Sequence, residues 1–193
     1  YMWVMRNNTI FLLNIDMLTL SQKAQKMLAS PIRKLVPFAD EAKKRGTKVY
    51  HLNIGQPDII SPDQALDAVK LNKLTLVEYP NSAGIESYRK GLAKYYQNIN
   101  INVDYTDINI TTGGSEALQI ALAVTCDPDD EVIVMEPFYT NYNSFALQND
   151  VKLVPITTTI ETGFALPSVE EFEKKITPKT KGIILCNPAN PTG

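Results

Sequence analysis

The sequence predicts an α/β protein whose sheet is mostly parallel and flanked by helices. From Asp107 onward, short apolar segments typical of strands alternate with longer segments of helix-forming residues. Strands separated by helices form βαβ units, whose right-handed crossovers produce parallel sheets. The last such segment, 182–186, is a continuous apolar run, as in a parallel strand covered on both faces. With 193 residues, 44% of them hydrophobic, the chain can bury a hydrophobic core.

The first sixteen residues, Tyr1 to Asp16, differ from the rest of the chain. Their apolar stretch, 10–13, is too short to span a membrane, and no small-residue cleavage site comes after it. A more ordinary amphipathic segment begins at Met17. We interpret residues 1–16 as upstream translated sequence or an artefact, and the alternative is an N-terminal arm that clasps a partner subunit.

A helix is predicted over 33–45, opened by Ser30-Pro31-Ile32. Its last turn is rich in Lys and Arg, and Gly46 stands where a C-terminal cap belongs. Residues 49–54 alternate as a short strand does, and Gly-Gln-Pro-Asp at 55–58 ends it. His51, the only histidine, lies in this strand without a paired carboxylate or cysteine, so we regard it as structural.

The strongest local signal is a glycine turn between a strand and a helix. Residues 107–112 alternate polar and apolar, Gly113-Gly114-Ser115 form the turn, and 116–123 are strong helix formers. Glycines let the backbone approach an anion, and a helix start offers free N–H groups and a positive dipole end. The turn therefore predicts a phosphate site. The alternative is a tight turn in which Ser115 only caps the helix. The pattern fits neither Gly-x-Gly-x-x-Gly nor the P-loop.

Beyond the turn, the alternation of strands and helices continues. The predicted elements are a strand at 131–135, a loop at 136–139, a helix at 141–148, a strand at 152–156, a helix with Val169, Phe172 and Ile176 on one face, and the strand at 182–186. Asn190 follows this last strand. Ligands bind at the carboxyl ends of strands in open α/β sheets, although Asn-Pro-x-Asn-Pro is also ordinary turn chemistry.

Composition excludes several classes of partner and site. A net charge of −2 gives no electrostatic basis for binding nucleic acid or an anionic membrane, which leaves small metabolites as partners. The two cysteines, Cys126 and Cys186, lie far apart and lack Cys-x-x-Cys spacing, so neither a disulfide framework nor a zinc site is predicted. A reducing cytoplasm fits this composition.

Five motifs in order resemble those of class I/II aminotransferases, which are pyridoxal-phosphate enzymes of fold type I. The resemblance is strongest to the branch that contains aspartate aminotransferase. The motifs are Asn-Ile-Gly-Gln-Pro-Asp at 53–58, Tyr-Pro-Asn-Ser-Ala-Gly-Ile at 79–85, Thr-Gly-Gly-Ser-Glu-Ala-Leu at 112–118, Asp-Glu-Val-Ile-Val-Met-Glu-Pro-Phe-Tyr at 130–139 and Asn-Pro-Ala-Asn-Pro-Thr-Gly at 187–193. Each is moderately specific, but five in order make coincidence improbable.

The resemblance implies roles in binding pyridoxal 5′-phosphate. Backbone N–H groups of Gly113, Gly114 and Ser115 would hold its phosphate, in agreement with the anion site inferred from the turn. Tyr139 would stack on the pyridine ring, and Asn190 would donate to the phenolic oxygen. The alternative for Tyr139 is a half-buried core tyrosine.

The resemblance also implies substrate and subunit contacts. The substrates would be an amino acid and a 2-oxo acid, with the Gly55 backbone near the substrate carboxylate and Tyr139 and Asn190 beside it. Tyr79 would reach the phosphate bound by a neighbouring subunit, which implies a homodimer of the full-length protein. Cis peptide bonds are expected at Glu136-Pro137 and Asn190-Pro191.

Three groups that transamination requires are not assigned in this chain. In this family the lysine that bonds the cofactor, the acid beside the pyridine nitrogen and the arginine for the substrate carboxylate all follow Asn-Pro-Thr-Gly. No lysine here follows a similar motif, so we name no catalytic residue and expect the chain alone to be inactive and poorly soluble. The alternatives are a non-catalytic relic that binds a phosphate-bearing ligand or a partner, and a lyase, decarboxylase or cyclisation activity on the same cofactor.

These considerations predict three regions. Residues 1–16 are the extension, 17–60 form an N-terminal arm and a small-domain segment, and 61–193 form an incomplete large cofactor-binding domain of the fold type I class.

Overall fold

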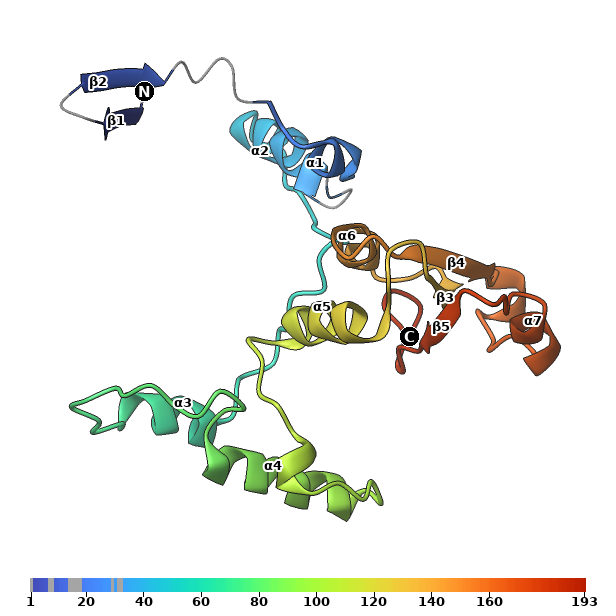
Figure 1. The fold of residues 1–193 in the computed structure, drawn as a ribbon. Coiled ribbons are helices and arrows are strands. Elements are labelled where there is room, and N and C mark those ends of the chain that lie inside the picture. Colours follow the sequence, from blue (N-terminus) through green and yellow to red (C-terminus); the bar gives the residue numbers. More distant parts are fainter. Residues whose placement is uncertain (1, 7–8, 14–18, 29, 31–32) are drawn as a thin grey trace. The chain divides into compact units, whose positions relative to one another are not determined.

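The computed structural model describes every residue except 1, 7–8, 14–18, 29 and 31–32 (Figure 1). The chain divides into two compact units, one of residues 1–34 with 119–193 and one of residues 35–118. The division falls inside a helix, α5 (Gly114–Thr125), after Leu118. The division predicted from sequence, into 1–16, 17–60 and 61–193, stays a prediction.

A three-stranded parallel sheet forms the centre of the first unit. Its strands are β3 (Glu131–Glu136), β4 (Lys152–Thr157) and β5 (Thr180–Ile184), in the order β4-β3-β5 (Figure 1). Ile133 in the central strand is paired with Val154 on one side and Ile183 on the other. The predicted mostly parallel α/β sheet is therefore confirmed.

The core of this unit lies on β3 and the helix that follows it. Val132, Ile133 and Val134 are buried along β3. Helix α6 (Asn141–Gln148) buries Tyr142, Phe145 and Ala146, and residues of α6 contact β4. A run of apolar β-branched residues suits a central strand because both of its edges are hydrogen-bonded and both of its faces are covered.

The last strand differs from its prediction in position and burial. The sequence predicts a strand at 182–186 covered on both faces, whereas β5 begins and ends two residues earlier. Its side chains alternate between half-buried and exposed, and Ile183 is 45% exposed. The cause is its place at the edge of the described sheet, where it has one neighbouring strand, β3.

The helix before β5 is also shorter than predicted. Helix α7 (Val169–Glu173) follows a short 3₁₀ helix, Ile160–Thr162, and ends before Ile176. Val169 and Ile176 are exposed, so the predicted apolar face is not buried among the described residues. A short helix gains most of its stability from packing an apolar face. Three of the five residues of α7 are glutamates, so this segment has few apolar side chains to pack and the helix stays short.

The N-terminal part of this unit consists of a hairpin and a short helix. Strands β1 (Met2–Arg6) and β2 (Thr9–Leu13) pair antiparallel. Helix α1 (Gln22–Lys26) begins after Ser21, whose hydroxyl accepts the Ala24 N–H at 3.1 Å. The Lys23 ammonium lies 2.7 Å from the Asp150 carboxylate, at the turn that leads into β4. The predicted boundary at Asp16 and Met17 lies outside the described residues.

The second unit is mainly helical. A 3₁₀ helix, Arg33–Leu35, leads into α2 (Val36–Lys44). Gly46 has a φ of +81°, and the N–H groups of Gly46 and Thr47 donate to Lys43 at 2.9 Å and Ala42 at 3.0 Å. This is the Schellman arrangement, so the predicted glycine cap is confirmed. The predicted helix opening at Pro31 and Ile32 lies outside the described residues.

Helices α3 (Asp63–Lys70) and α4 (Glu86–Asn98) follow, and α4 packs against a 3₁₀ helix, Tyr105–Asp107. The buried Arg89 of α4 donates to the Tyr105 carbonyl at 3.3 Å, and its guanidinium lies over the Tyr105 ring. This contact joins the two elements.

The two strands predicted in this unit, 49–54 and 107–112, do not form. Both segments alternate, and Ile108 and Ile110 are indeed less exposed than Asn109 between them. A strand requires a hydrogen-bonded neighbour, and neither segment pairs with another segment among the described residues. Ile110 makes one such bond, from its N–H to the Ala83 carbonyl at 3.0 Å.

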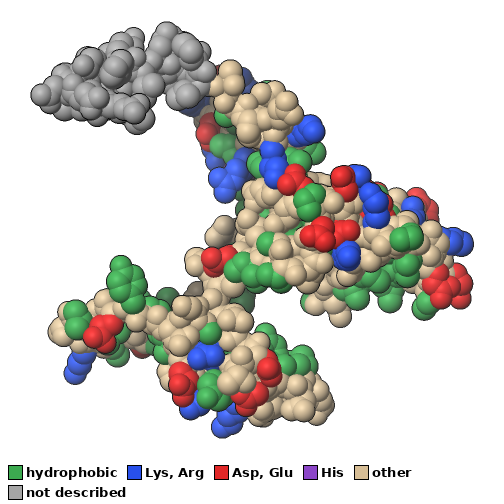
Figure 2. All heavy atoms as spheres, in the orientation of Figure 1, with side chains coloured by type: hydrophobic (Ala, Val, Ile, Leu, Met, Phe, Trp, Pro, Cys, Tyr) green, Lys and Arg blue, Asp and Glu red, His purple; other side chains and the backbone are tan. Residues whose placement is uncertain are grey.

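Many apolar side chains of this second unit lie at the surface, and Figure 2 shows hydrophobic side chains on the visible face of the molecule. The most exposed are Leu52, Ile59, Ile60, Val77 and Tyr79. Within the part of the chain that the structure describes, no helix combines the length and the apolar character needed to cross a membrane.

Candidate functional site

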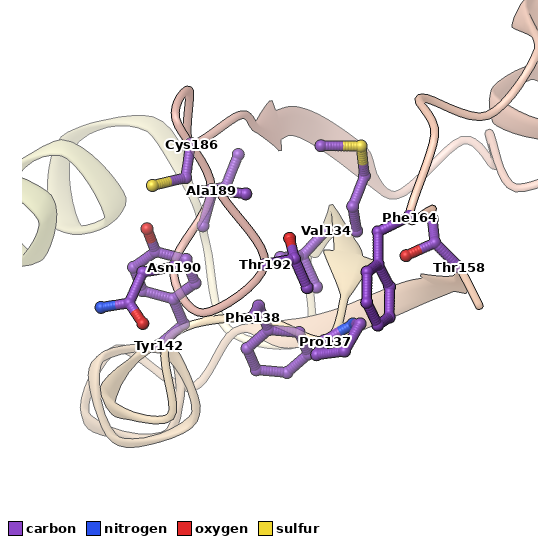
Figure 3. A pocket seen from close by; sticks show the side chains of 12 residues that line it. Val134, Pro137, Phe138, Tyr142, Thr158, Phe164, Cys186, Ala189, Asn190 and Thr192 are labelled. Carbon is purple, nitrogen blue, oxygen red and sulfur yellow. The ribbon is translucent and has the colours of Figure 1, made fainter. Parts of the chain in front are cut away.

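A pocket lies at the carboxyl ends of β3 and β5 (Figure 3). Its lining comes from the end of β3, the loop before α6, the first turn of α6, the segment after β4 and the loop after β5. Asn190, Cys186 and Tyr142 lie at one end of the pocket in Figure 3, and Thr158 and Phe164 lie at the other. The predicted position of a ligand site, at the carboxyl ends of parallel strands, thus coincides with a pocket.

Asn190 reaches this pocket from the loop that follows β5. The side chain is exposed, and the loop is closed by a hydrogen bond from the Gly193 N–H to the Ala189 carbonyl at 2.7 Å. The Glu136-Pro137 and Asn190-Pro191 bonds are cis, as expected, and Asn187-Pro188 is cis as well. An exposed amide at the mouth of a pocket is free to donate to a ligand oxygen.

Tyr139 lies just outside the pocket lining. Its ring is half-buried, its hydroxyl accepts a hydrogen bond from the Asn141 amide at 2.7 Å, and its ring meets that of Tyr142 edge to face, with centroids 5.6 Å apart. The aromatic wall of the pocket is instead formed by Phe138 and Tyr142, whose rings stack at 6.1 Å. Sequence reasoning missed both residues. For Tyr142 a signal existed, because it lies one helical turn after Tyr139.

Tyr142 and Cys186 form a polar contact inside this aromatic wall. The Tyr142 and Cys186 side chains lie together at one end of the pocket (Figure 3), and the Cys186 thiol donates to the Pro188 carbonyl at 3.3 Å. Burial, followed by the Cys186 contact, raises the pKa of Tyr142 above its ordinary value. The hydroxyl therefore stays protonated and remains a hydrogen-bond donor across the physiological pH range. Neither Cys186 nor the other cysteine, Cys126, forms a disulfide.

A second polar group nearby has no partner among the described residues. The Thr140 hydroxyl, between Tyr139 and α6, is buried without a hydrogen bond. Buried polar groups are normally paired, but Thr140 is not among the residues that line the pocket, so this hydroxyl is not assigned to the site.

The glycine turn belongs to the other unit and is described by itself. Gly113 has a φ of +80°, a conformation that favours glycine, and no atom lies within 4 Å of the position a Cβ would take. Helix α5 begins at Gly114, two residues before the predicted start, so Ser115 lies inside the first turn and not at the cap. All three residues of the turn, Gly113, Gly114 and Ser115, are exposed.

Two donors at this turn are already used. The Gly113 N–H donates to the Thr111 carbonyl at 2.9 Å. The Thr112 N–H donates to the Glu116 carboxylate, a contact that the sequence analysis did not predict. The Thr111 hydroxyl donates to the Gly113 carbonyl at 3.0 Å. The N–H groups of the first helical turn have no acceptor within the helix, and these remain available for an anion.

The remaining predicted site residues, Gly55 and Tyr79, also lie in the 35–118 unit. Gly55 is exposed with open space around it, and the Tyr79 side chain is fully exposed. His51 lines a surface groove along α2. Among the described residues no group of three or more His, Cys, Asp or Glu side chains could hold a metal ion.

The pocket combines aromatic rings with a polar amide. The rings come from Phe138 and Tyr142, and the amide comes from Asn190. Aromatic walls with a few directed polar groups are typical of cofactor sites. The separate glycine turn offers the anion-binding chemistry that a phosphate group needs.

Comparisons with known proteins agree on one family. The family model described as "Aminotransferase class I and II" matches residues 47–193. The aspartate/prephenate aminotransferase of Thermus thermophilus is 31% identical over 176 residues, which cover 90% of this chain and 46% of that protein. The chain therefore spans about half the length of the curated relatives it matches.

Solved structures give the same result. A mutant of Thermus thermophilus aspartate aminotransferase matches with a TM-score of 0.81 and 31% identity, over 92% of this chain and 47% of that one. An alanine aminotransferase from Pyrococcus furiosus matches with a TM-score of 0.80 and 31% identity, over 90% of this chain and 45% of that one. The α/β architecture of the described chain matches these structures over roughly half their length.

Proposed function

We propose that this chain, which belongs to the class I and II aminotransferase family, forms the cofactor-holding part of an enzyme that moves an amino group between an amino acid and a 2-oxo acid. The observation that carries the proposal is Asn190 in an aromatic-walled pocket at the carboxyl ends of β3 and β5. The cofactor is pyridoxal 5′-phosphate, which the family uses. When bound, this cofactor supplies an electron sink for charge that develops at the substrate Cα.

The chain's own residues hold and orient the cofactor. Asn190 donates its amide N–H to the phenolic oxygen, and Tyr139 offers an aromatic face to the pyridine ring. N–H groups of Gly113, Gly114 and Ser115, together with the Ser115 hydroxyl, bind the phosphate with the help of the α5 dipole, and the Gly113 N–H exchanges its Thr111 acceptor for the phosphate. Support for the phosphate role comes from the left-handed backbone of Gly113 and from the open space around it.

The substrate occupies the open side of the pocket. The Gly55 backbone binds the substrate carboxylate, and Tyr139 and Asn190 border the reacting carbon. In the full-length homodimer, Tyr79 contributes to the phosphate site of the neighbouring subunit, and its complete exposure in this chain is consistent with that role. We place the enzyme in the cytoplasm, with no nucleic acid or membrane partner.

The proton transfer at the substrate carbon requires a base that we do not assign to this chain. A lysine of lowered pKa performs it in this class of chemistry, and no lysine here follows the family's motif. We therefore propose that these 193 residues bind the cofactor without catalysing transfer.

The experiment that tests this function uses the natural gene product. The protein is purified with added pyridoxal phosphate, treated with borohydride to fix any covalent adduct, and weighed intact by mass spectrometry. We expect a species heavier than 21.5 kDa with one adduct at a specific lysine, and amino transfer to a 2-oxo acid before reduction. A 21.5 kDa product with no specific adduct and no transfer would overturn the proposed enzyme.

A further inference from the structure

Tyr142 contacts Tyr139 and lines the same pocket as Asn190, the two residues to which the proposed function gives a role beside the cofactor ring. It lies in the first turn of α6, and its side chain is buried. Its ring meets the Tyr139 ring edge to face at an interplanar angle of 89°. An edge-to-face pair fixes the tilt of both rings, since the positive edge of one points to the negative face of the other.

The hydroxyl end of Tyr142 contacts the other side of the site. It lies beside Cys186 in the pocket, and the Cys186 thiol donates to the Pro188 carbonyl. Pro188 lies two residues before Asn190, in the same loop after β5. Figure 3 shows Tyr142, Cys186 and Asn190 gathered at one end of the pocket. The contact of Tyr142 with Cys186 and the hydrogen bond from Cys186 to Pro188 thus link α6 to the loop that carries Asn190.

A purely packing role would not need this hydroxyl. A buried hydroxyl costs free energy unless it is hydrogen-bonded, and phenylalanine would fill the same volume without that requirement. The Phe138 ring, stacked against Tyr142 at 6.1 Å, is such an apolar neighbour. The hydroxyl of Tyr142 therefore matters for the contact it makes with Cys186.

We propose that Tyr142 is a positioning residue, which holds the Tyr139 ring by edge-to-face contact and the Asn190 loop through Cys186 and Pro188. The proposal rests on the proposed function for the identity of the ligand, but the contacts themselves do not depend on it. Tyr142 acts on the cofactor through other residues and forms no part of the reacting centre.

The test compares two single variants and their combination. Tyr142→Phe keeps the ring and removes the hydroxyl, and Cys186→Ala removes the same link from the other side. Dissociation of pyridoxal 5′-phosphate is measured by tyrosine fluorescence quenching, together with the absorption maximum of the bound cofactor. Tyr95→Phe is the matched control, because Tyr95 is exposed on α4. The thermal midpoint reports on folding.

We expect each single variant to bind the cofactor about fivefold more weakly, as for one lost polar contact. We also expect the absorption maximum to move toward that of free cofactor. The double variant should lose no more than either single variant, because both break one link. Wild-type affinity and spectrum in Tyr142→Phe, or losses that add in the double variant, would overturn the proposal.

Amide hydrogen exchange in residues 187–193 separates this inference from the proposed function. If the wild-type chain binds no pyridoxal phosphate, the proposed function fails, but exchange still decides the positioning role. Faster exchange of this loop in both Tyr142→Phe and Cys186→Ala, at an unchanged thermal midpoint, supports the link. Unchanged exchange in the loop contradicts it, and so does equally faster exchange throughout 119–193.

Discussion

Residues 119–193 and residues 35–118 differ in how far their apolar side chains are buried. In the first segment Ile133 is fully buried between two neighbouring strands, whereas in the second Ile60 is 91% exposed. The two segments differ little in how apolar they are along the sequence, but only the first forms hydrogen-bonded strands among the described residues. An apolar alternating pattern therefore produces a strand and a core only where a partner strand lies beside it.

The largest expected effect is a loss of stability when a buried side chain of residues 119–193 is shortened. Ile133→Ala removes a fully buried side chain from the central strand and should lower the free energy of unfolding by about 4 kcal/mol. Its matched control, Ile60→Ala, removes an exposed side chain and should change that free energy by less than about 0.5 kcal/mol. Urea unfolding with hydrogen exchange at β3 measures both. Similar losses in the two variants would break the comparison.

A somewhat smaller loss of stability is expected at a tightly packed position of the 35–118 unit. Gly84 has a φ of +99°, and an added Cβ would lie 2.6 Å from the Ile110 Cβ. Gly84→Ala should therefore destabilise this unit by about 3 kcal/mol, from backbone strain and overlap together.

The control for that variant is Gly113→Ala, which has a similar φ of +80° but no atom within 4 Å of the added Cβ. It should cost about 1 kcal/mol, from the backbone alone. Thermal unfolding of the two variants, with exchange of the Ile110 amide as a local probe, separates the two causes. Equal losses of stability in the two variants would mean that the overlap between the added Cβ and Ile110 does not destabilise the protein.

Alkaline pH should destabilise the unit that contains the sheet through the ionisation of Tyr142. The folded-state pKa of Tyr142 is raised by burial and by Cys186, with Tyr139 a smaller cause. The folded state therefore holds a proton that the unfolded state loses near pH 10, its ordinary value. The associated stability is fully present below about pH 10 and is lost as pH rises through the folded pKa. Tyr142→Phe should flatten this loss in alkaline unfolding curves, and an unchanged curve would contradict the assignment.

The smallest expected change is a gain in stability at a glycine of α4. Gly91 lies inside α4 with nothing within 4 Å of an added Cβ. Gly91→Ala should stabilise the protein by up to about 1 kcal/mol, since alanine restricts the unfolded chain and favours the helix. Thermal unfolding measures it. A loss of stability would show that the α4 surface is covered in solution.

The sheet could be predicted from sequence because its signals are local. Strand β3, helix α6 and strand β4 begin and end within one residue of the prediction, since each has a regular pattern and a clear turn at its ends. The segments 49–54 and 107–112 have a similar pattern but no neighbouring strand among the described residues, and no local signal reports that.

The candidate site shows the same limit. The position of Asn190 at a strand's carboxyl end follows from topology, so sequence sufficed to place it beside a pocket. The contact of Tyr142 with Cys186, by contrast, joins α6 to a loop distant in sequence, and the Glu116 side chain on Thr112 depends on the local helix geometry. A non-local contact such as that of Tyr142 with Cys186 leaves no periodic trace in a single sequence.

The most direct test of the proposed cofactor site is equilibrium binding of pyridoxal 5′-phosphate to the wild-type chain, with Asn190→Ala and Ser115→Ala alongside and inorganic phosphate as competitor. We predict saturable binding of one cofactor per chain, weakened by both substitutions and competed by phosphate. Absence of saturable binding, or equal affinity in all three proteins, would contradict the assignment of these residues to a cofactor site.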